Sequence, residues 1–275
     1  MNKVFFGDCR DSMKKLAAEG VKVQTCVTSP PYYGLRNYEV DGQLGLEETP
    51  EEYISNMVKV FRCVWDILAD DGTLWINIGD SYGKEKQLLM IPARVALALQ
   101  SDGWVLRQDI IWSKGNPMPE SVKDRCTKSH EYIFLLSKSS KYYYDNEAIK
   151  YLATSTDTSN RDRDGTRLNN TPGRSKMGGL KTNDYTMANK RSVWTVNTKP
   201  YRGAHFAVYP IELIEPCILA GSRVGDIVLD PFMGSGTTAA AALTHNRQYI
   251  GCELNKDYES LQLERLATVT PKLIF

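Results

Sequence analysis

One strand–helix–strand unit near the end of the chain decides the fold, and its first part reads Asp226-Ile227-Val228-Leu229-Asp230-Pro231-Phe232-Met233-Gly234-Ser235-Gly236-Thr237-Thr238. The segment 226–230 predicts a buried strand, and the glycines after it predict a tight turn. An alanine-rich helix is expected from there to about residue 246, followed by a strand at 248–253. A strand, a helix and a strand in this order indicate two parallel strands of one sheet.

Strands and helices alternate along most of the remaining chain. Short β-rich or alternating runs predict strands at 21–27, 73–78, 104–112, 131–136 and 192–194. Apolar residues at helical spacing predict helices from residue 49 or 50 to about 70, from 92 to 100 and from 211 to 220. The predicted fold class is therefore α/β, with a parallel sheet covered by helices on both faces.

The composition is that of a globular protein with one large domain or two small ones. The chain has 275 residues, of which 42% are hydrophobic, and this is enough to bury a core. It contains no run of about 18 apolar residues, so no membrane span is expected, and Asp8 comes too early for a signal peptide. The six cysteines form no C-x-x-C pair. We therefore expect no metal site, no disulfide framework and a cytoplasmic location.

The distribution of charge is more informative than the net charge of +1. Between residues 151 and 200 there are nine Lys or Arg, four Asp and no Glu. The segment 155–190 has little apolar periodicity, so we predict a loop or insert there. A basic insert in a nearly neutral protein favours a groove that meets nucleic-acid phosphates, and the alternative is a solvated loop with incidental charge.

The glycine turn after residue 230 is predicted to bind a ligand. Its glycines allow a ligand to approach the backbone closely, and the helix that begins near Thr237-Thr238 presents free N–H groups to a negative group such as a carboxylate. Glu253 ends the second strand, 23 residues after Asp230. An acid at that place can accept hydrogen bonds from two ribose hydroxyls.

Two other kinds of nucleotide site compete for this turn. A P-loop would need lysine after Gly236, where this chain has Thr237. A nicotinamide site, and with it an oxidoreductase, fits the pattern G-x-G-x-x-A formed by Gly234, Gly236 and Ala239, but this short pattern is weakly specific.

A second motif, Ser29-Pro30-Pro31-Tyr32, follows the strand predicted at 21–27. The Ser29 hydroxyl and the Pro30 carbonyl could accept both N–H bonds of an exocyclic amine and so direct its lone pair at a methyl donor. Proline fixes the direction of that carbonyl, and Tyr32 offers a ring on which an extruded base can stack. The alternative is a turn that only ends the strand. If the motif is catalytic, most of the rate of methyl transfer would come from orienting the amine rather than from a strong base.

A pair typical of cytosine C5 methylation, Pro216-Cys217, lies elsewhere in the chain. That reaction needs a cysteine nucleophile on a loop. Cys217 lies within the apolar pattern of a predicted helix, so we expect it to belong to the core.

Together the two motifs resemble those of β-class DNA amino-methyltransferases, which modify N4 of cytosine or N6 of adenine. The resemblance covers nearly the whole chain outside the basic insert. It implies a Rossmann-like, circularly permuted methyltransferase fold with seven strands, one of them antiparallel, and with the catalytic motif before the cofactor motif. The implied organisation is a catalytic part at 1–150, a target-recognition insert at 151–195 and a cofactor-binding part at 196–275.

The resemblance also implies roles for individual residues. Ser29, Pro30, Pro31 and Tyr32 would be catalytic, and Asp8 would contact the adenine of S-adenosylmethionine while also capping a helix over 12–18. The further cofactor-binding candidates are Cys9, His205, Phe206, Asp230, Pro231, Phe232, Gly234, Ser235, Gly236, Thr237, Thr238 and Glu253. The candidates for DNA binding are Arg36, Arg161, Arg163, Arg167, Arg174, Lys176 and Lys181. The segments 111–114 and 130–131 match family blocks that are structural or line the base pocket.

The target base and the partners follow from the resemblance alone. Adenine enzymes of this group mostly have Asp or Asn where this chain has Ser29, so N4 of cytosine is favoured and N6 of adenine is the alternative. Double-stranded DNA is the expected substrate. A cognate restriction endonuclease and a homodimer are further partners that such enzymes have. A DNA-binding module without catalysis is the remaining alternative, which the two intact motifs oppose.

Overall fold

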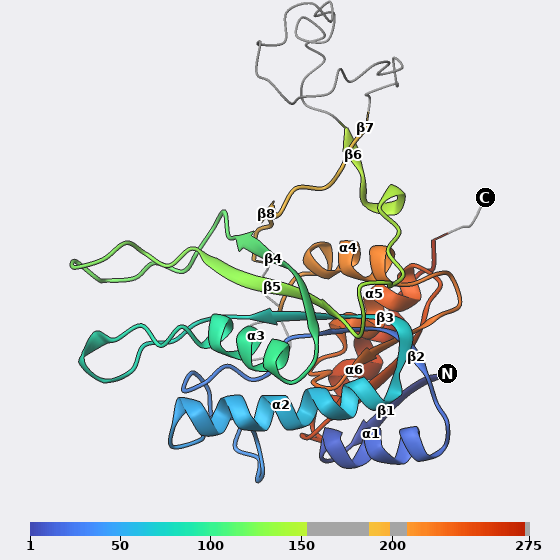
Figure 1. The fold of residues 1–275 in the computed structure, drawn as a ribbon, viewed down its shortest axis with the longest axis horizontal. Coiled ribbons are helices and arrows are strands. Elements are labelled where there is room, and N and C mark those ends of the chain that lie inside the picture. The colour runs from blue at the N-terminus through green and yellow to red at the C-terminus, as the bar shows by residue number, and fades with distance from the viewer. Residues whose placement is uncertain (153–186, 199–207, 273–275) are drawn as a thin grey trace, which may run out of the picture. The chain divides into compact units, whose positions relative to one another are not determined.

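A computed structural model describes residues 1–152, 187–198 and 208–272 (Figure 1). The chain divides into two compact units, one formed by Met1–Asp145 with Arg191–Phe275 and the other by Asn146–Lys190. The described part of the second unit holds a short 3-10 turn, Glu147–Ile149, and a two-stranded antiparallel ribbon of β6 (Tyr151–Leu152) and β7 (Met187–Ala188). The first unit contains every other element described below.

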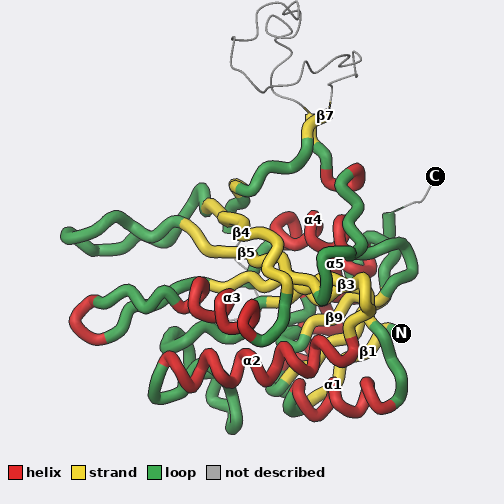
Figure 2. Tube along the Cα trace, viewed as in Figure 1, coloured by secondary structure: helices red, strands yellow, loops and turns green. Residues whose placement is uncertain are grey.

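The first unit is built on one sheet of eight described strands (Figures 1 and 2). In spatial order these are β1 (Asn2–Phe6), β10 (Gln248–Glu253), β9 (Ile227–Asp230), β2 (Val23–Thr28), β3 (Leu68–Ile78), β5 (His130–Ser137), β4 (Val105–Ser113) and β8 (Val193–Thr195). Neighbouring strands are parallel except for β5, which is antiparallel to both β3 and β4. The single antiparallel strand agrees with expectation. The count of seven was wrong, because the three-residue β8 adds an edge strand beside β4.

Helices cover both faces of this sheet. On one side α1 (Cys9–Ala18) packs against α2 (Pro50–Ile67), and α2 packs against α3 (Ile91–Ser101). On the other side α4 (Ile211–Gly221) contacts α5 (Thr237–Thr244), which contacts α6 (Tyr258–Ala267), and Figure 1 shows α1 and α4 on opposite sides of the strands. The doubly covered α/β fold is therefore confirmed. No described helix is long and apolar enough to cross a membrane.

The longest helix, α2, shows how the local sequence sets an element. The hydroxyl of Thr49 accepts a hydrogen bond from the Glu52 amide at 3.2 Å, and Pro50 occupies the first turn, where a missing N–H costs nothing. The helix ends at Ile67, a few residues earlier than the sequence predicted, because Leu68 is already extended and pairs with Val23 of β2. The strand β3 is correspondingly longer than expected.

Two further expectations for helices are confirmed, namely the core position of Cys217 and the capping of a helix by Asp8. Cys217 is 1% exposed inside α4, so it is a core residue rather than a loop nucleophile. Gly221, at the end of α4, lies so close to the sheet that a Cβ would come within 2.7 Å of the hydroxyls of Thr25 and Thr73. Asp8 caps α1 as predicted, although the helix begins at Cys9 rather than at residue 12.

Candidate active site

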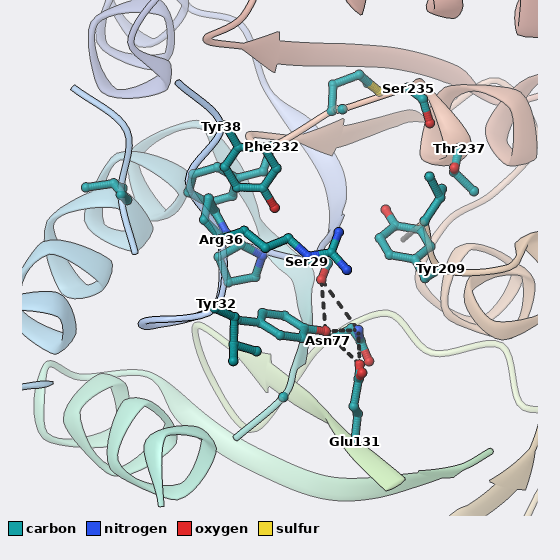
Figure 3. Close-up of a pocket in the computed structure, with 18 of the residues that line it drawn as sticks. Ser29, Tyr32, Arg36, Tyr38, Asn77, Glu131, Tyr209, Phe232, Ser235 and Thr237 are labelled. Atoms are coloured by element: carbon teal, nitrogen blue, oxygen red, sulfur yellow. Dashed lines mark hydrogen bonds between the residues drawn. The ribbon is translucent and has the colours of Figure 1, made fainter. Parts of the chain in front are cut away.

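The carboxyl ends of five parallel strands lie side by side and place the predicted motifs together. These strands are β1, β10, β9, β2 and β3, in that order. In such sheets the loops after the carboxyl ends form the ligand site. Here they line a cavity of about 900 Å³, whose walls include Asp8, Ser29 to Tyr32, Asn77, Glu131, Phe232 to Ser235 and Glu253 (Figure 3).

Two of the catalytic candidates, Ser29 and Tyr32, form a hydrogen-bonded network with Asn77 and Glu131 within this cavity (Figure 3). Ser29 Oγ donates to the Tyr32 hydroxyl at 3.3 Å, and Tyr32 donates to Glu131 Oε2 at 2.6 Å. Asn77 Nδ2 lies 2.7 Å from the Tyr32 oxygen, 3.0 Å from Glu131 Oε2 and 3.4 Å from Ser29 Oγ. The loop after β2 is thus tied to β3 and β5, and its serine is held at a fixed place.

Glu131 is the charged end of this network. Its second carboxylate oxygen pairs with the Lys114 ammonium, which also lies 4.6 Å above the ring centre of Trp112. Burial and the neighbouring carboxylate of Glu131 raise the pKa of Tyr32 well above its ordinary value. Tyr32 is therefore a neutral phenol that can donate its proton to Glu131.

The ring of Tyr32 also depends on a glycine. A Cβ on Gly79, just after β3, would come within 2.7 Å of Tyr32 Cε2. Only glycine at that position lets the ring lie against the strand end. The hydroxyl of Tyr53, a buried residue of α2, donates to the Pro31 carbonyl at 2.8 Å and holds the middle of the same loop.

The carboxylate of Asp230 fixes the glycine turn from behind the cavity wall. It is fully buried and accepts hydrogen bonds from the hydroxyls of Thr28 at 2.6 Å, Thr238 at 2.5 Å and Tyr209 at 3.1 Å, and from the Phe232 amide at 3.0 Å. Burial raises the pKa of Asp230, and these donors oppose the rise. Four hydrogen bonds to one buried carboxylate make the turn rigid.

Glu253, at the end of β10, faces the cavity. Its carboxylate accepts from the Gly234 amide at 2.7 Å and from the Asn255 amide at 2.8 Å. Burial raises the pKa of Glu253, although these amides counteract it. The residue is 9% exposed, so its carboxylate is a largely desolvated acceptor at the end of the glycine turn.

The turn itself leaves space and an unused polar atom for a ligand. Gly234 has φ +52°, and a Cβ there would have only the Phe232 carbonyl, at 4.0 Å, within reach. Ser235 and Asn77 line the cavity, and the Ser235 Oγ and Asn77 Oδ1 atoms are buried without a hydrogen-bond partner among the described residues. Such groups cost free energy unless something else pairs with them. The turn therefore leaves room for a ligand next to side chains whose hydrogen-bonding capacity is not used within the described residues.

Asp8 follows β1, at the start of α1. It lines the side of the cavity opposite β3 and β5, which carry Asn77 and Glu131. It accepts from the Arg10 amide at 2.8 Å, and the Arg10 guanidinium forms an ion pair with it at 2.5 Å. The hydrogen bonds from Arg10 lower the pKa of Asp8. The site therefore has a second, ionised carboxylate on the β1 side.

The structure brings together most, but not all, of the predicted site residues. Those that line the cavity are Asp8, Cys9, Ser29, Pro30, Pro31, Tyr32, Arg36, Pro231, Phe232, Gly234, Ser235, Thr237 and Glu253. Asp230, Gly236 and Thr238 lie in the same turn but do not line the cavity. The others lie outside the described residues, namely His205, Phe206, Arg161, Arg163, Arg167, Arg174, Lys176 and Lys181.

The sequence analysis did not predict Asn77 as a site residue. It placed Glu131 and Lys114 only within two segments that are structural or line the base pocket. Asn77 is buried at 3% exposure near the end of the apolar strand β3, and a polar residue at the end of a buried strand was the available signal. The sequence analysis assigned no role to Tyr209, whose contact with Asp230 spans 21 residues of sequence.

A comparison with protein-family models identifies the chain. The model described as DNA methylase, of the N6/N4 type, matches residues 23–264, a span that includes both motifs. This chain belongs to the N4/N6 DNA amino-methyltransferase family. The methylase is 43% identical over 291 residues to the type II methyltransferase M.Cfr9I of Citrobacter freundii, covering 96% of this chain and 87% of that relative.

Solved structures agree with this assignment. The methylase superposes on the PvuII DNA methyltransferase, described as cytosine-N4-specific, with a TM-score of 0.71 over 96% of this chain and 86% of the other, and at 19% identity this likeness concerns the fold. It also resembles a DNA modification methylase of Thermus thermophilus, TTHA0409, solved as a complex with S-adenosyl-L-methionine, with a TM-score of 0.64, 26% identity and coverage of 99% and 96%.

Proposed function

We propose that this methylase transfers a methyl group from S-adenosylmethionine to the exocyclic N4 of a cytosine extruded from double-stranded DNA. The observation that carries the proposal is the cavity in which the Ser29 loop and the glycine turn face each other. One wall holds acceptors for an amine, and the other holds the buried carboxylate of Glu253 and the hydroxyl of Ser235, which has no hydrogen-bond partner within the described part of the chain. These are the groups that a reacting base and a nucleoside cofactor need.

The catalytic wall acts by orienting the amine. The lone pair of the cytosine amino group is delocalised into the ring, so the nitrogen is a poor nucleophile. Ser29 Oγ and the Pro30 carbonyl each accept one N–H bond, which turns the lone pair away from the ring and towards the opposite wall. Holding two groups in this geometry supplies most of the acceleration in such a transfer. The nitrogen would form a bond to the methyl carbon as the bond between that carbon and the sulfonium sulfur breaks, so that S-adenosylhomocysteine leaves as a neutral thioether, and the methylated nitrogen would then release one proton to water.

The opposite wall holds S-adenosylmethionine, which supplies an electrophilic methyl group when bound. Glu253 accepts hydrogen bonds from the ribose hydroxyls, and Asp8 contacts the adenine. The turn from Phe232 to Thr237 encloses the remainder, with the orphaned Ser235 Oγ as a hydrogen-bonding group. Asp230 supports this wall from behind through Thr28 and Thr238.

The preference for cytosine rests on Ser29, and N6 of adenine is the alternative with the same fold and mechanism. DNA binding is assigned to Arg36, which lines the same cavity as Ser29, and to the basic residues of the insert. A cognate restriction endonuclease that cuts the same site and a second copy of the chain are further partners that we propose.

The test is mass spectrometry of nucleosides from mixed-sequence genomic DNA incubated with the enzyme and labelled S-adenosylmethionine. Labelled N4-methylcytosine is the expected product. Labelled N6-methyladenine would contradict the role of Ser29 in base choice and leave the transfer to an amino group intact. A calorimetric titration accompanies it, in which S-adenosylmethionine should bind and NAD should not. Binding of NAD alone would overturn the proposal.

A further inference from the structure

The carboxylate of Glu131 fixes the direction of the hydrogen bonds that lead to Ser29. A carboxylate can only accept, so the Tyr32 hydroxyl must use its single proton on Glu131, at 2.6 Å. The Tyr32 oxygen is then available only as an acceptor. Ser29 Oγ, 3.3 Å away, donates its own single proton to that oxygen.

Asn77 reinforces the same direction. Its Nδ2 lies 3.0 Å from Glu131 Oε2 and 2.7 Å from the Tyr32 oxygen, which are both acceptors. A flipped amide would place Oδ1 against the carboxylate, and the repulsion would disfavour it. The amide nitrogen therefore faces the network, and its two N–H bonds are shared among three acceptors, of which Ser29 Oγ at 3.4 Å is the most distant.

We infer that Glu131 is a positioning residue that makes Ser29 an obligate acceptor for the substrate amine. The proton of Ser29 is engaged with Tyr32, so the side of Oγ that faces the cavity carries a lone pair. A serine free to rotate could instead donate to the amine nitrogen and occupy the electron pair that must attack the methyl group. This inference rests on the proposed amino-methylation, and it gives Tyr32 a role for its hydroxyl as well as for its ring.

The surroundings of Glu131 support this role. The Lys114 ammonium holds the other carboxylate oxygen, and the Glu131 side chain is only 14% exposed, so water competes little for it. Charge-assisted hydrogen bonds in such places are stronger than neutral ones. The negative charge is thereby transmitted through Tyr32 to Ser29, which becomes a better acceptor without itself being charged.

The experiment compares Glu131→Gln, Tyr32→Phe and the double variant. In Glu131→Gln the new amide can donate to the Tyr32 oxygen, and Tyr32 can then turn its proton towards Ser29. In Tyr32→Phe the ring remains but the connection to Ser29 is lost. We expect each single variant to lower kcat about 10- to 100-fold, as for loss of a charge-assisted hydrogen bond. Affinity for S-adenosylmethionine should stay within about twofold, because neither residue is on the cofactor wall.

The double variant provides the readout that a structural role would not give. If Glu131 acts through the Tyr32 hydroxyl, the double variant should be no slower than the slower single variant. The control is Glu51→Gln, which removes another carboxylate in an ion pair, the exposed pair with Arg94 outside the cavity, and should leave kcat unchanged.

Three outcomes would overturn the inference. A Tyr32→Phe enzyme at the wild-type rate would show that only the ring matters. Losses that multiply in the double variant would show that the two residues act separately. Loss of cofactor binding in either single variant would indicate a structural role. If the wild type transfers no methyl group to DNA while S-adenosylmethionine binds, the proposed function fails, and the inference falls with it.

Discussion

At the scale of single residues, the loop after β2 offers uncharged oxygen atoms as hydrogen-bond acceptors for the proposed substrate amine. Ser29 is held between Tyr32 and Asn77, while the Pro31 carbonyl is occupied by the Tyr53 hydroxyl. The Pro30 carbonyl has no such partner among the hydrogen bonds of the described loop, so it and Ser29 remain as the acceptors for the substrate. The catalytic power assigned here to the loop therefore resides in two oxygen atoms.

Replacing Ser29 by alanine should remove one of those acceptors. We expect kcat to fall about 10- to 100-fold. The affinity for S-adenosylmethionine should stay within about twofold, because Ser29 lies on the wall of the cavity opposite the glycine turn. Single-turnover methyl transfer and calorimetry measure the two quantities. Ser260→Ala, on exposed α6, is the matched control. Equal loss of binding and turnover in Ser29→Ala would mean that this serine only supports the loop.

Replacing Glu253 by glutamine should affect binding instead. The charged acceptor disappears while the shape remains, so affinity for S-adenosylmethionine should fall about 10-fold or more, as expected for hydrogen bonds to a charged group. DNA affinity measured without cofactor should not change. The matched control is Glu259→Gln, an exposed residue of α6. Unchanged cofactor affinity would remove Glu253 from the binding site.

At the scale of elements, Asp230 joins parts of the chain that are far apart in sequence. Through Thr28 it contacts β2, through Thr238 it contacts α5, and through Tyr209 it contacts the segment that leads into α4. One buried carboxylate thus sets how the catalytic and cofactor loops lie relative to each other. The cost is burial of a carboxylate that has no cationic partner among the described residues, and this burial raises the pKa of Asp230.

This raised pKa gives a pH dependence with a definite sign. The folded protein binds a proton at Asp230 more tightly than the unfolded chain does, so its contribution to stability is full below the unfolded pKa, near 3.8, and is lost as pH rises through the higher folded pKa. Asp230→Asn does not titrate. We compare the free energy of unfolding of the two proteins by urea unfolding. The difference, wild type minus Asp230→Asn, should be more positive at about pH 4 than at about pH 8. A difference that grows with pH would contradict this assignment.

The elements differ in how well the sequence predicted them, and the reason is burial. The strand β9 and the helix α5 follow the predicted pattern closely, because their side chains are almost all buried. The strand β1 and the helix α6 were not predicted. The strand β1 has no buried residue, and the one buried residue of α6 is polar, Gln262, so neither shows an apolar period.

In the site, the parts set by contiguous sequence were predicted, and the contacts between residues far apart in the sequence were not. Ser29 to Tyr32 and the glycine turn are contiguous motifs, so the sequence alone predicted them as loops at strand ends. The contact between Asn77 and Glu131 joins residues 54 apart and depends on the antiparallel register that pairs Ile78 with Tyr132. No periodicity in the sequence specifies that register, so the network around Ser29 needed the structure.

At the scale of the whole molecule, positive charge is concentrated in one segment of the chain. The net charge is +1, yet residues 151–200 carry nine Lys or Arg against four Asp. The lining of the cavity is close to electrically balanced, because its carboxylates, such as Asp8, Glu131 and Glu253, are accompanied by the cations Arg10, Arg36, Lys114 and Lys128, so the cavity alone offers little net attraction for DNA phosphates. We therefore assign most of the phosphate contacts to the basic insert, and this assignment has a measurable consequence.

Neutralising two phosphate contacts should change the salt dependence of DNA binding by a known amount. If Arg174 and Lys176 each meet a phosphate, replacing both by alanine should reduce the slope of log K against log salt concentration by about 2. Affinity for S-adenosylmethionine should not change. The matched control replaces Lys14 and Lys15, two exposed lysines of α1 outside the cavity, and should leave the slope as in the wild type. An equal change in both double variants would show that net charge, not the insert, governs the attraction to DNA.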